Sequence, residues 1–320
     1  MIVESVLKLL FAPVLRKPRI LSHGEDGDGI ASAAIALRRY PNAVLALATP
    51  HEVQRAGRLS LINMVKWDVV LDLPCPRRAA LWIDHHESNI PRAKKSIHDP
   101  RAPCAAVLAV KALDMEEDSL SVKLAQLAVE TDTASIESAE GWLLNDAVKG
   151  SPAKMRVKLA KLLAEKGLDA FSVEEVAGWI EANRRIRENT EKLSERIEPL
   201  EITVLVVERG RSKKISYRGL MLSLEKRGAR LVALCYRLSS RRWKVMLGCR
   251  GEFNCSKIAQ ALGGGGHRAA SGATVEAESL EELLEVLGKV LPLSGARLVK
   301  ISEAGDIEVV DMEGDARRLS

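Results

Sequence analysis

The chain has 320 residues, of which 28% are charged, 47% are hydrophobic and only 3% are aromatic, and its formal net charge is +5. This length fits two domains with separate cores, and the apolar content is too high for a disordered chain. No run of about 18 uncharged apolar residues is present, so no membrane-spanning helix is expected. The mild positive charge is compatible with an anionic partner, and the scarcity of aromatic side chains argues against long single strands stacked on aromatic platforms.

The first 18 residues are apolar but interrupted by charge. Glu4, Lys8 and Pro13 fall inside the apolar stretch, and no small-residue cleavage site follows it. This pattern favours an amphipathic first helix over a signal peptide. The five cysteines contain no C-x-x-C pair and are too sparse for a disulfide scaffold, so we expect most of them to be buried thiols. Together these features predict a cytoplasmic protein.

Short apolar strands and helical segments alternate in the next part of the chain. Four segments have the pattern of buried strands: residues 19–22, 44–48, 68–73 and 80–84. Residues 30–40 have helical spacing and good helix formers. Buried strands separated by helices predict a largely parallel α/β sheet, whose ligands bind at the carboxyl ends of the strands. Polar residues lie at three of these ends, at His23, at Asp72 and at Asp84 with the two histidines that follow it.

The rest of the chain divides into a helical stretch and a second α/β unit. Residues 104–198 are predicted to be almost entirely helical, and their polar end is typical of a connector between domains. Three strands and a late helix are predicted after Pro199: residues 202–208, 231–238, 243–250 and 279–291. The expected parts are an N-terminal domain with a parallel sheet and a helical half, a connector helix, and a smaller C-terminal α/β domain: residues 1–183, 184–200 and 201–320.

The segment SHGEDGDGIAS places His23, Asp26 and Asp28 in a glycine-rich turn between a strand and a helix. Such a turn lets side chains converge on one point, as a cation requires, although acidic turns without metal are also common. Asp72 ends an apolar run, where a carboxylate is costly unless it is paired or bound to metal. Asp132 could add another carboxylate and, taken alone, is more simply a helix-end residue. Three strand ends that supply Asp and His to one edge are hard to explain by structure alone.

The candidate ligands form a mixed imidazole and carboxylate set: His23, Asp26, Asp28, Asp72, His85 and Asp132. Such a set suits Mn²⁺ better than Ca²⁺, and the absence of nearby cysteines argues against structural zinc. Two ions about 3.5–4 Å apart that share a carboxylate would activate a water and clamp a phosphoryl group. We therefore expect two divalent ions, with Mn²⁺ preferred and Mg²⁺ or Co²⁺ as alternatives.

Five segments of the chain resemble, in order, the motifs of DHH phosphoesterases with a DHH-associated second domain. These segments are HGEDGDG, the LDL around Asp72, WIDHHES, ETDTAS and ALGGGGHRAASGA. The family includes nanoRNases, 3′-phosphoadenosine-5′-phosphate phosphatases and RecJ-like exonucleases. The resemblance covers the chain from about residue 19 to residue 275 and implies a phosphoesterase with two α/β domains.

The resemblance implies a role for each matching residue. One ion would be bound by His23 and Asp26, and the other by Asp28, His85 and Asp132. Asp72 would bridge the two ions. His86 would contact the substrate phosphate, and Asp84 would orient the histidines. The first motif departs from the family's usual spacing, which leaves Glu25 as an alternative for a share of the role given to Asp26. Cys104 stands where the family commonly has a hydroxyl residue.

The glycine run at residues 263–266 lies beside two side-chain donors, His267 and Arg268. Glycines let the backbone approach a ligand and turn its N–H groups toward an anion, and a plain flexible turn is the alternative. The resemblance implies a pocket for the substrate end that lies away from the scissile phosphate, formed by Arg250, Gly264, Gly265, Gly266, His267 and Arg268.

These observations predict a phosphodiesterase that shortens small oligonucleotides by one nucleoside monophosphate at a time. A 3′-phosphoadenosine-5′-phosphate phosphatase and a phosphodiesterase of linear or cyclic dinucleotides are alternatives within the family. A catalytically inactive nucleic-acid-binding scaffold is an alternative of another class, and the presence of all expected Asp and His residues argues against it. The expected partner is a short oligonucleotide or nucleotide and not a membrane, and a homodimer stays open.

Overall fold

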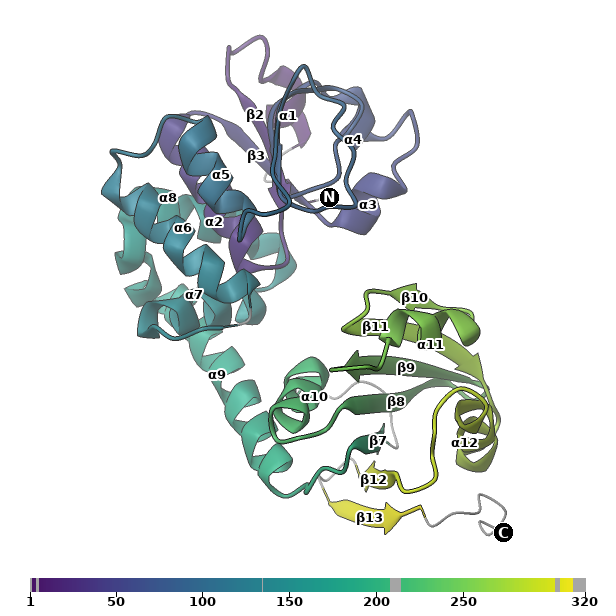
Figure 1. Ribbon diagram of the computed structural model, residues 1–320. Coiled ribbons are helices and arrows are strands. Elements are labelled where there is room, and N and C mark those ends of the chain that lie inside the picture. The colour runs from purple at the N-terminus through teal and green to yellow at the C-terminus, as the bar shows by residue number, and fades with distance from the viewer. Residues whose placement is uncertain (1, 4–5, 134, 208–213, 303–305, 313–320) are drawn as a thin grey trace. The chain divides into compact units, whose positions relative to one another are not determined.

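The computed structural model divides the chain into two compact units, Met1–Arg184 and Arg185–Ser320 (Figure 1). The described parts of the chain are residues 2–3, 6–133, 135–207, 214–302 and 306–312. Five residues of the predicted elements or motifs therefore lie outside the described ones: Met1, Glu4, Ser5, Ala134 and Glu208. No helix within the described ranges is long and apolar enough to cross a membrane.

The first unit contains a six-stranded sheet in the order β1-β3-β2-β4-β5-β6. Its strands are β1 (Ile2–Val3), β2 (Arg19–His23), β3 (Val44–Ala48), β4 (Trp67–Leu71), β5 (Ala79–Asp84) and β6 (Lys95–His98). Strands β2 to β6 run parallel, and β1 pairs antiparallel with β3. The largely parallel sheet predicted from the sequence is confirmed, and the sequence pattern misses β1 and β6.

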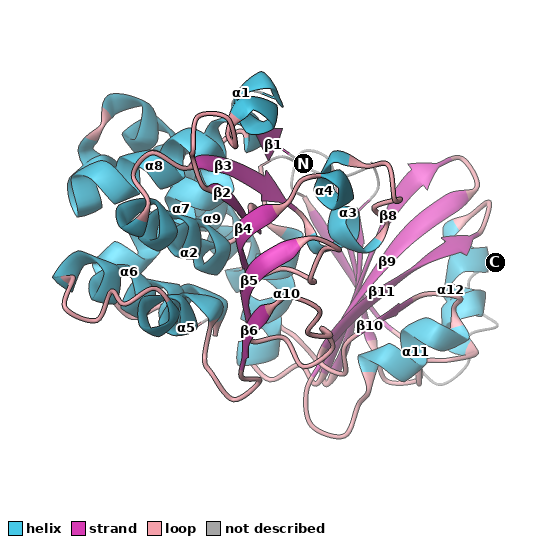
Figure 2. Cartoon of the chain, turned by 90° about the horizontal axis from the view of Figure 1, so that it is seen from above, coloured by secondary structure: helices cyan, strands magenta, loops and turns pink. Residues whose placement is uncertain are grey.

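Helices cover both faces of this sheet, as Figure 2 shows from above. One face carries the short helices α1 (Val6–Phe11), α3 (Pro50–Gln54) and α4 (Leu61–Met64). The other face carries α2 (Gly27–Arg39), α5 (Ala105–Ala112), α6 (Ser119–Asp132), α7 (Ala139–Gly150) and α8 (Arg156–Lys166). Two 3₁₀ helices flank α8, at Ala153–Met155 and Gly167–Ser172. Successive residues of β2 point to opposite faces, so Ile20 and Leu21 pack into different cores.

The first helix is shorter than the sequence pattern predicts. Helix α1 ends at Phe11, two residues before Pro13, whose ring cannot continue a helix. Residues upstream of it form β1 instead. The helix is amphipathic, as expected, because Leu9 is fully buried while Leu7 and Leu10 are exposed.

The second unit contains a seven-stranded sheet in the order β10-β11-β9-β8-β7-β12-β13. Its strands are β7 (Ile202–Val207), β8 (Leu231–Ser239), β9 (Arg242–Cys249), β10 (Gly265–Gly266), β11 (Ala270–Glu276), β12 (Arg297–Ile301) and β13 (Ile307–Asp311). Helix α10 (Tyr217–Lys226) packs into one core of this unit, and α11 (Cys255–Ala261) and α12 (Leu280–Gly288) pack into the other. Helix α9 (Glu174–Glu195) spans the division between the units, with Val176 in the first unit's core and Leu193 in the second's.

Two of the five cysteines are not thiols. Cys249 and Cys255 form a disulfide between the end of β9 and the start of α11, with their Cα atoms 5.7 Å apart. The expectation of buried thiols is wrong for this pair, because the turn from β9 into α11 brings two cysteines together that share no recognised spacing. Cys104 and Cys235 are buried free thiols, and Cys75 is half-buried. Burial raises the pKa of the Cys235 thiol to about 12.

Candidate metal centre

Polar residues gather where three parallel strands of the first sheet end. His23 ends β2, Asp72 directly follows β4, and Asp84 ends β5. The carboxyl ends of parallel strands share one edge, and this is where α/β sheets bind ligands. Asp26 joins the group as the N-cap of α2, where its side chain accepts a hydrogen bond of 3.0 Å from the N–H of Gly29. Asp72 has a φ of +53°, a left-handed conformation that Asp and Asn adopt more readily than most residues.

His23 contacts two carboxylates with the same ring nitrogen. Its Nδ1 lies 3.0 Å from Oδ2 of Asp26 and 3.3 Å from Oδ2 of Asp72. Burial lowers the pKa of His23, but the hydrogen bonds and charges of these two aspartates outweigh it and raise the pKa to about 10. The Glu25 carboxylate is 4.0 Å from Nε2, and its side chain is 58% exposed. The geometry therefore favours Asp26 over Glu25 as the acidic partner of His23.

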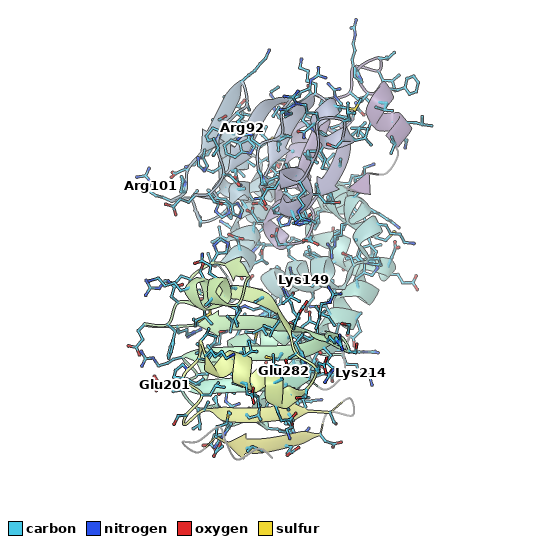
Figure 3. All side chains as sticks on the ribbon, turned by 90° about the vertical axis from the view of Figure 1, so that its right-hand side faces the viewer. Arg92, Arg101, Lys149, Glu201, Lys214 and Glu282 are labelled. Atoms are coloured by element: carbon cyan, nitrogen blue, oxygen red, sulfur yellow. A yellow bond between two sulfur atoms is a disulfide. The ribbon has the colours of Figure 1, made fainter. Side chains whose placement is uncertain are left out.

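Two basic side chains from the helical half hold the turn that carries His23. Nζ of Lys149, labelled in Figure 3, donates to the carbonyl oxygen of Glu25 at 2.8 Å. Nη1 of Arg156 donates to the carbonyl oxygen of Gly24, also at 2.8 Å. Sequence reasoning missed both contacts, because a basic residue on a helix is usually a solvated one and the acceptors are backbone atoms.

His85 faces a second group of carboxylates. Its Nε2 lies 3.7 Å from Oδ2 of Asp132, 3.8 Å from Oδ2 of Asp28 and 3.9 Å from Oδ1 of Asp72. Its Nδ1 lies 3.3 Å from the carbonyl oxygen of Ala102, which fixes the orientation of the ring. The carboxylates of Asp28, Asp72 and Asp132 thus all approach one imidazole nitrogen of His85.

Asp28 is fully buried and held by the backbone. The N–H groups of Ala105 and Ala106, the first residues of α5, donate to its two carboxylate oxygens at 2.7 and 2.8 Å. Burial and the charges of neighbouring carboxylates raise the pKa of Asp28 to about 6. The N-cap of α5 is Cys104, whose side chain forms no capping hydrogen bond, so Asp28 satisfies two of the N–H groups that are free at the start of a helix.

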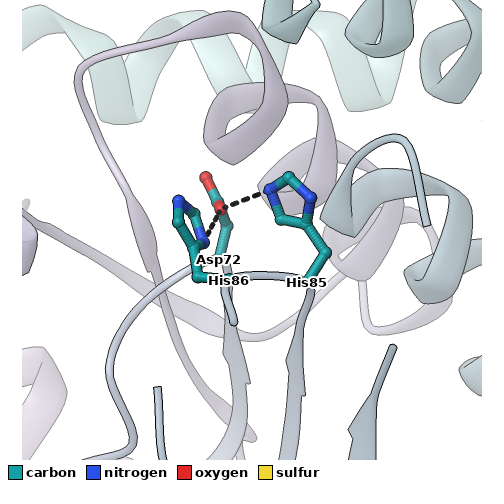
Figure 4. A group of neighbouring side chains, drawn as sticks. All are labelled: Asp72, His85 and His86. Carbon is teal, nitrogen blue, oxygen red and sulfur yellow. Dashed lines mark ion pairs between the residues drawn. The ribbon is translucent and has the colours of Figure 1, made fainter. Parts of the chain in front are cut away.

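Asp84 positions His86 and is itself held in place. Oδ1 of Asp84 lies 2.9 Å from Nδ1 of His86, and Nδ2 of Asn89 donates to Oδ2 at 2.6 Å. The hydrogen bond to Asp84 raises the pKa of His86. His86 Nδ1 is also 3.5 Å from Oδ1 of Asp72, which lies between the two histidines in Figure 4. This arrangement leaves Nε2 of His86 directed away from Asp84.

Three buried polar atoms of the cluster have no hydrogen-bond partner among the described residues: Nε2 of His23, Oδ1 of Asp72 and Nε2 of His85. Buried polar atoms are almost always paired, and an unpaired buried carboxylate is costly. Burial also raises the pKa of Asp72 well above its usual value. Three groups have ligand atoms within 4.8 Å of one another: Asp72 with His85 and His86, His23 with Asp26 and Asp72, and Asp28 with His85 and Asp132. These residues fit divalent cations, and Asp72 belongs to two of the groups.

The remaining candidates lie in the second unit, around the start of α11. Nε of Arg250 is 3.5 Å from Oε2 of Glu225, a buried carboxylate that also accepts a 2.9 Å hydrogen bond from Nη1 of Arg218. Nη2 of Arg268 donates to the carbonyl oxygen of Gly251 at 3.2 Å. Glu225 and Arg218 were missed from the sequence, because they lie on α10 and only the fold brings them to Arg250.

The glycine run has a structural explanation at two positions. A Cβ at Gly264 would lie 2.3 Å from the carbonyl oxygen of Gly272, and Gly266 has a φ of +141°. Both glycines are therefore required by the pairing of β10 with β11. At Gly265, by contrast, a Cβ would meet nothing within 4 Å. The backbone approach to a ligand that the sequence suggests stays a prediction for Gly265 and for the exposed His267.

The fold and the cluster at the carboxyl edge agree with the family resemblance of the sequence. A parallel sheet with Asp and His at this edge, joined to a second α/β unit, is the arrangement implied by the resemblance to DHH phosphoesterases. Residues 201–291 match the family model of the DHHA1 domain. The chain has the DHH phosphoesterase fold followed by a DHHA1 domain, so the resemblance seen in the sequence is confirmed.

Three solved structures from bacteria illustrate the similarity of the fold. The pGpG-specific phosphodiesterase PggH from Vibrio cholerae has a TM-score of 0.68 and 16% identity, over 86% of this chain and 99% of that chain. An exopolyphosphatase-related protein from Bacteroides fragilis has a TM-score of 0.54 and 15% identity, over 86% and 92%. RecJ from Thermus thermophilus in complex with Mn²⁺ has a TM-score of 0.50 and 16% identity, over 92% of this chain and 55% of that chain. No curated protein sequence matches significantly.

Proposed function

We propose that this protein is a metal-dependent phosphodiesterase that hydrolyses short oligonucleotides and releases nucleoside monophosphates in the cytoplasm. The observation that carries the proposal is the convergence of three buried ligand atoms without a hydrogen-bond partner among the described residues, on His23, Asp72 and His85, at the carboxyl edge of a DHH-type sheet. A buried cluster of this kind is unfavourable as plain structure, because its carboxylates repel one another and three of its buried polar atoms lack a hydrogen bond to any described residue.

Divalent ions bound there would neutralise charge on the phosphate and lower the pKa of a bound water. We propose that His23 and Asp26 bind one ion and that Asp28, His85 and Asp132 bind the other. Asp72 would be shared between the two ions. We propose Mn²⁺, with Mg²⁺ and Co²⁺ as alternatives. The Thermus thermophilus RecJ structures, solved with Mn²⁺ and with Mg²⁺, support a divalent ion.

His86 is the residue we assign to the substrate phosphate. Asp84 occupies its Nδ1, and Asn89 holds Asp84, so the ring is fixed and its Nε2 is available to donate to a nonbridging oxygen. The side chain of His86 is 45% exposed, whereas that of Asp84 is fully buried. This difference agrees with a contact residue placed by a buried orienting carboxylate.

The second unit would bind the substrate end that lies away from the scissile bond. Its proposed contacts are Arg250, Gly264, Gly265, Gly266, His267 and Arg268. His267 and Arg268 are exposed, and guanidinium groups suit phosphate oxygens. We expect His267→Ala to raise KM about tenfold with little change in kcat, because it removes a hydrogen bond to substrate and not to the reacting atoms. His51→Ala, at an exposed histidine of α3, is the matched control in steady-state kinetics.

A phosphodiesterase of linear dinucleotides is the second candidate function. It is favoured by the similarity to PggH, whose whole length is matched in fold and which is described as specific for pGpG. A 3′-phosphoadenosine-5′-phosphate phosphatase would use the same cluster and stays the third alternative.

The test is a comparison of turnover with Mn²⁺ on four substrates: pGpG, a pentanucleotide, a long single strand and 3′-phosphoadenosine-5′-phosphate. We expect turnover of the dinucleotide and the pentanucleotide and its loss with a chelator. Turnover of pGpG alone would favour the second candidate, and a preference for the long strand would contradict the proposal. No turnover of any substrate with Mn²⁺, Mg²⁺ or Co²⁺ would favour the inactive scaffold.

A further inference from the structure

A second concentration of charge lies at the opposite edge of the first sheet, before β4, β5 and β6 begin. An open surface pocket of about 530 Å³ is lined there by Arg58, Asn63, Arg77, Arg78 and Arg92. Arg78 directly precedes β5, and Arg92 lies in the loop that leads into β6. Of the described residues that line the cavity, none is acidic.

Three of these guanidinium groups are unpaired. The side chains of Arg58, Arg77 and Arg92 form no hydrogen bond or ion pair with any residue that the structure describes, and all three are exposed. Arg78 differs, because its Nη1 donates to the carbonyl oxygen of Met64 at 2.9 Å. Like charges around one cavity repel, so this arrangement does not stabilise the fold by itself. An anion bound between the guanidinium groups would replace this repulsion with attraction.

The loops that carry the arginines are fixed by a buried amide. Nδ2 of Asn63 donates to the carbonyl oxygens of Ala56 and Gly57 at 2.8 and 3.2 Å, and its Oδ1 accepts a 3.1 Å hydrogen bond from the N–H of Arg77. The side chain of Asn63 thus ties the segment that precedes Arg58 to the segment that precedes β5. Its exposure is only 9%, so these bonds are shielded from water.

The third loop is held through Cys75. Burial raises the pKa of this thiol, and the backbone and charge of Arg92 oppose that effect. Cys75 and Ala93 also pack against the same apolar core. Arg92, labelled in Figure 3, therefore extends from an anchored backbone. The backbone around the pocket is held in place, and the exposed guanidinium groups extend from it. A backbone that is already ordered reduces the entropic cost of binding a ligand.

We propose that this arginine pocket binds an oligophosphate, a ligand with several neighbouring phosphate groups. The planar guanidinium fork matches phosphate oxygens in a bidentate way, and several forks around one cavity suit several phosphates better than a single carboxylate. Two sources carry this chemistry, the polyphosphate chain of a free nucleotide and successive phosphates of a single-stranded nucleic acid. The pocket lies at the edge away from the candidate metal centre, so the inference does not depend on the proposed hydrolysis.

The test measures binding to the full chain with a chelator present, so that neither metal binding nor turnover contributes. One probe is inorganic tripolyphosphate, followed by calorimetry, and the other is a short labelled single-stranded oligonucleotide, followed by fluorescence anisotropy. We expect Arg58→Gln, Arg77→Gln and Arg92→Gln each to weaken binding about tenfold, since each removes charged hydrogen bonds. Arg92→Lys keeps the charge but loses the fork, and we expect a smaller loss.

Arg242→Gln is the matched control. Arg242 is an exposed residue of β9 in the second unit, and its side chain also lacks a partner among the described residues. This variant should bind both probes as the parent does. The probe whose binding the three pocket variants weaken more identifies the source of the phosphates. Failure of both probes to bind, unchanged binding by the three pocket variants, or an equal loss in Arg242→Gln would each overturn the proposal.

Discussion

The two edges of the first sheet carry opposite charge and differ in burial. At the carboxyl edge, Asp28 and Asp72 are almost completely buried and lie against imidazole rings. At the amino edge, Arg58, Arg77 and Arg92 are exposed on loops that are fixed only at the backbone. Both edges thus gather charged side chains, but only the first does so in the interior.

Burial decides what each edge requires. A charge in the interior loses its hydration, so the proposed cations would stabilise the carboxyl edge. Exposed guanidinium groups keep their water, and the amino edge tolerates an empty pocket. The comparison therefore predicts that the first edge controls activity and stability together, while the second controls binding with little effect on stability.

Asp72→Asn should have the largest effect. It removes the charge shared by two ligand groups but keeps the size of the side chain, and Asn tolerates the positive φ at this position. We expect turnover to fall about a thousandfold or more, with an unchanged circular dichroism spectrum. Asp114→Asn is the matched control, because Asp114 has a φ of +55° and is exposed outside the cluster. Near-normal turnover of Asp72→Asn would show that the metal assignment is wrong.

Metal binding should stabilise the fold through the carboxyl edge. A site that exists only in the folded chain raises stability by about 2.7 kcal/mol when the metal is at a hundredfold excess over its Kd. We therefore expect Mn²⁺ to raise the melting temperature of the parent and of Arg92→Gln alike, and to have little effect on Asp72→Asn. The measurement is thermal unfolding with and without Mn²⁺. Equal shifts in the parent and in Asp72→Asn would place the responsible site elsewhere.

A paired arginine should behave differently from the unpaired ones. Arg38 donates to both carboxylate oxygens of Asp118 at 2.6 Å and to the carbonyl oxygen of Ala164 at 2.8 Å. Arg38→Gln should therefore lower the free energy of unfolding by about 2 kcal/mol. Arg92→Gln should change it by less than about 0.5 kcal/mol. Urea unfolding checks both values, and a large loss in Arg92→Gln would mean that the arginine pocket is structural.

The carboxyl edge was predictable because its residues are adjacent to apolar runs. Asp72 and Asp84 directly end two such runs, and the rule that parallel strands end at one edge brings them together. What the sequence could not reveal are contacts to backbone atoms, such as those of Asp28 with the N–H groups at the start of α5. These contacts have no side-chain signature.

The amino edge was not predictable from the sequence. Arg58, Arg77 and Arg92 come from three separate loops and form no motif, so only the register of the sheet places them around one cavity. Strand β6 was also missed. Its sequence, KSIH, has only one branched apolar side chain, Ile97, and so lacks the apolar pattern of a buried strand. The disulfide required the turn from β9 into α11, which no spacing rule indicates.

The smallest expected effect is a pH dependence that separates the two kinds of arginine. The Arg38 guanidinium holds the pKa of Asp118 well below its usual value of 3.8. A carboxylate whose pKa is lower in the folded chain contributes stability that is fully present above the unfolded pKa and is lost as the pH falls through the folded pKa. The stability difference between the parent and Arg38→Gln should therefore shrink on acidification below about pH 4, whereas the difference for Arg92→Gln should stay flat.

The measurement is urea unfolding of the metal-free chain from about pH 6 down to about pH 3, where the same ionisations of the carboxyl edge affect every variant equally. Comparing differences between variants removes that shared contribution. A constant difference for Arg38→Gln across this range would mean that the charge of Asp118 does not stabilise the pair. A difference that develops for Arg92→Gln would instead reveal a carboxylate partner for Arg92, and the contrast between a paired and an unpaired arginine would no longer hold.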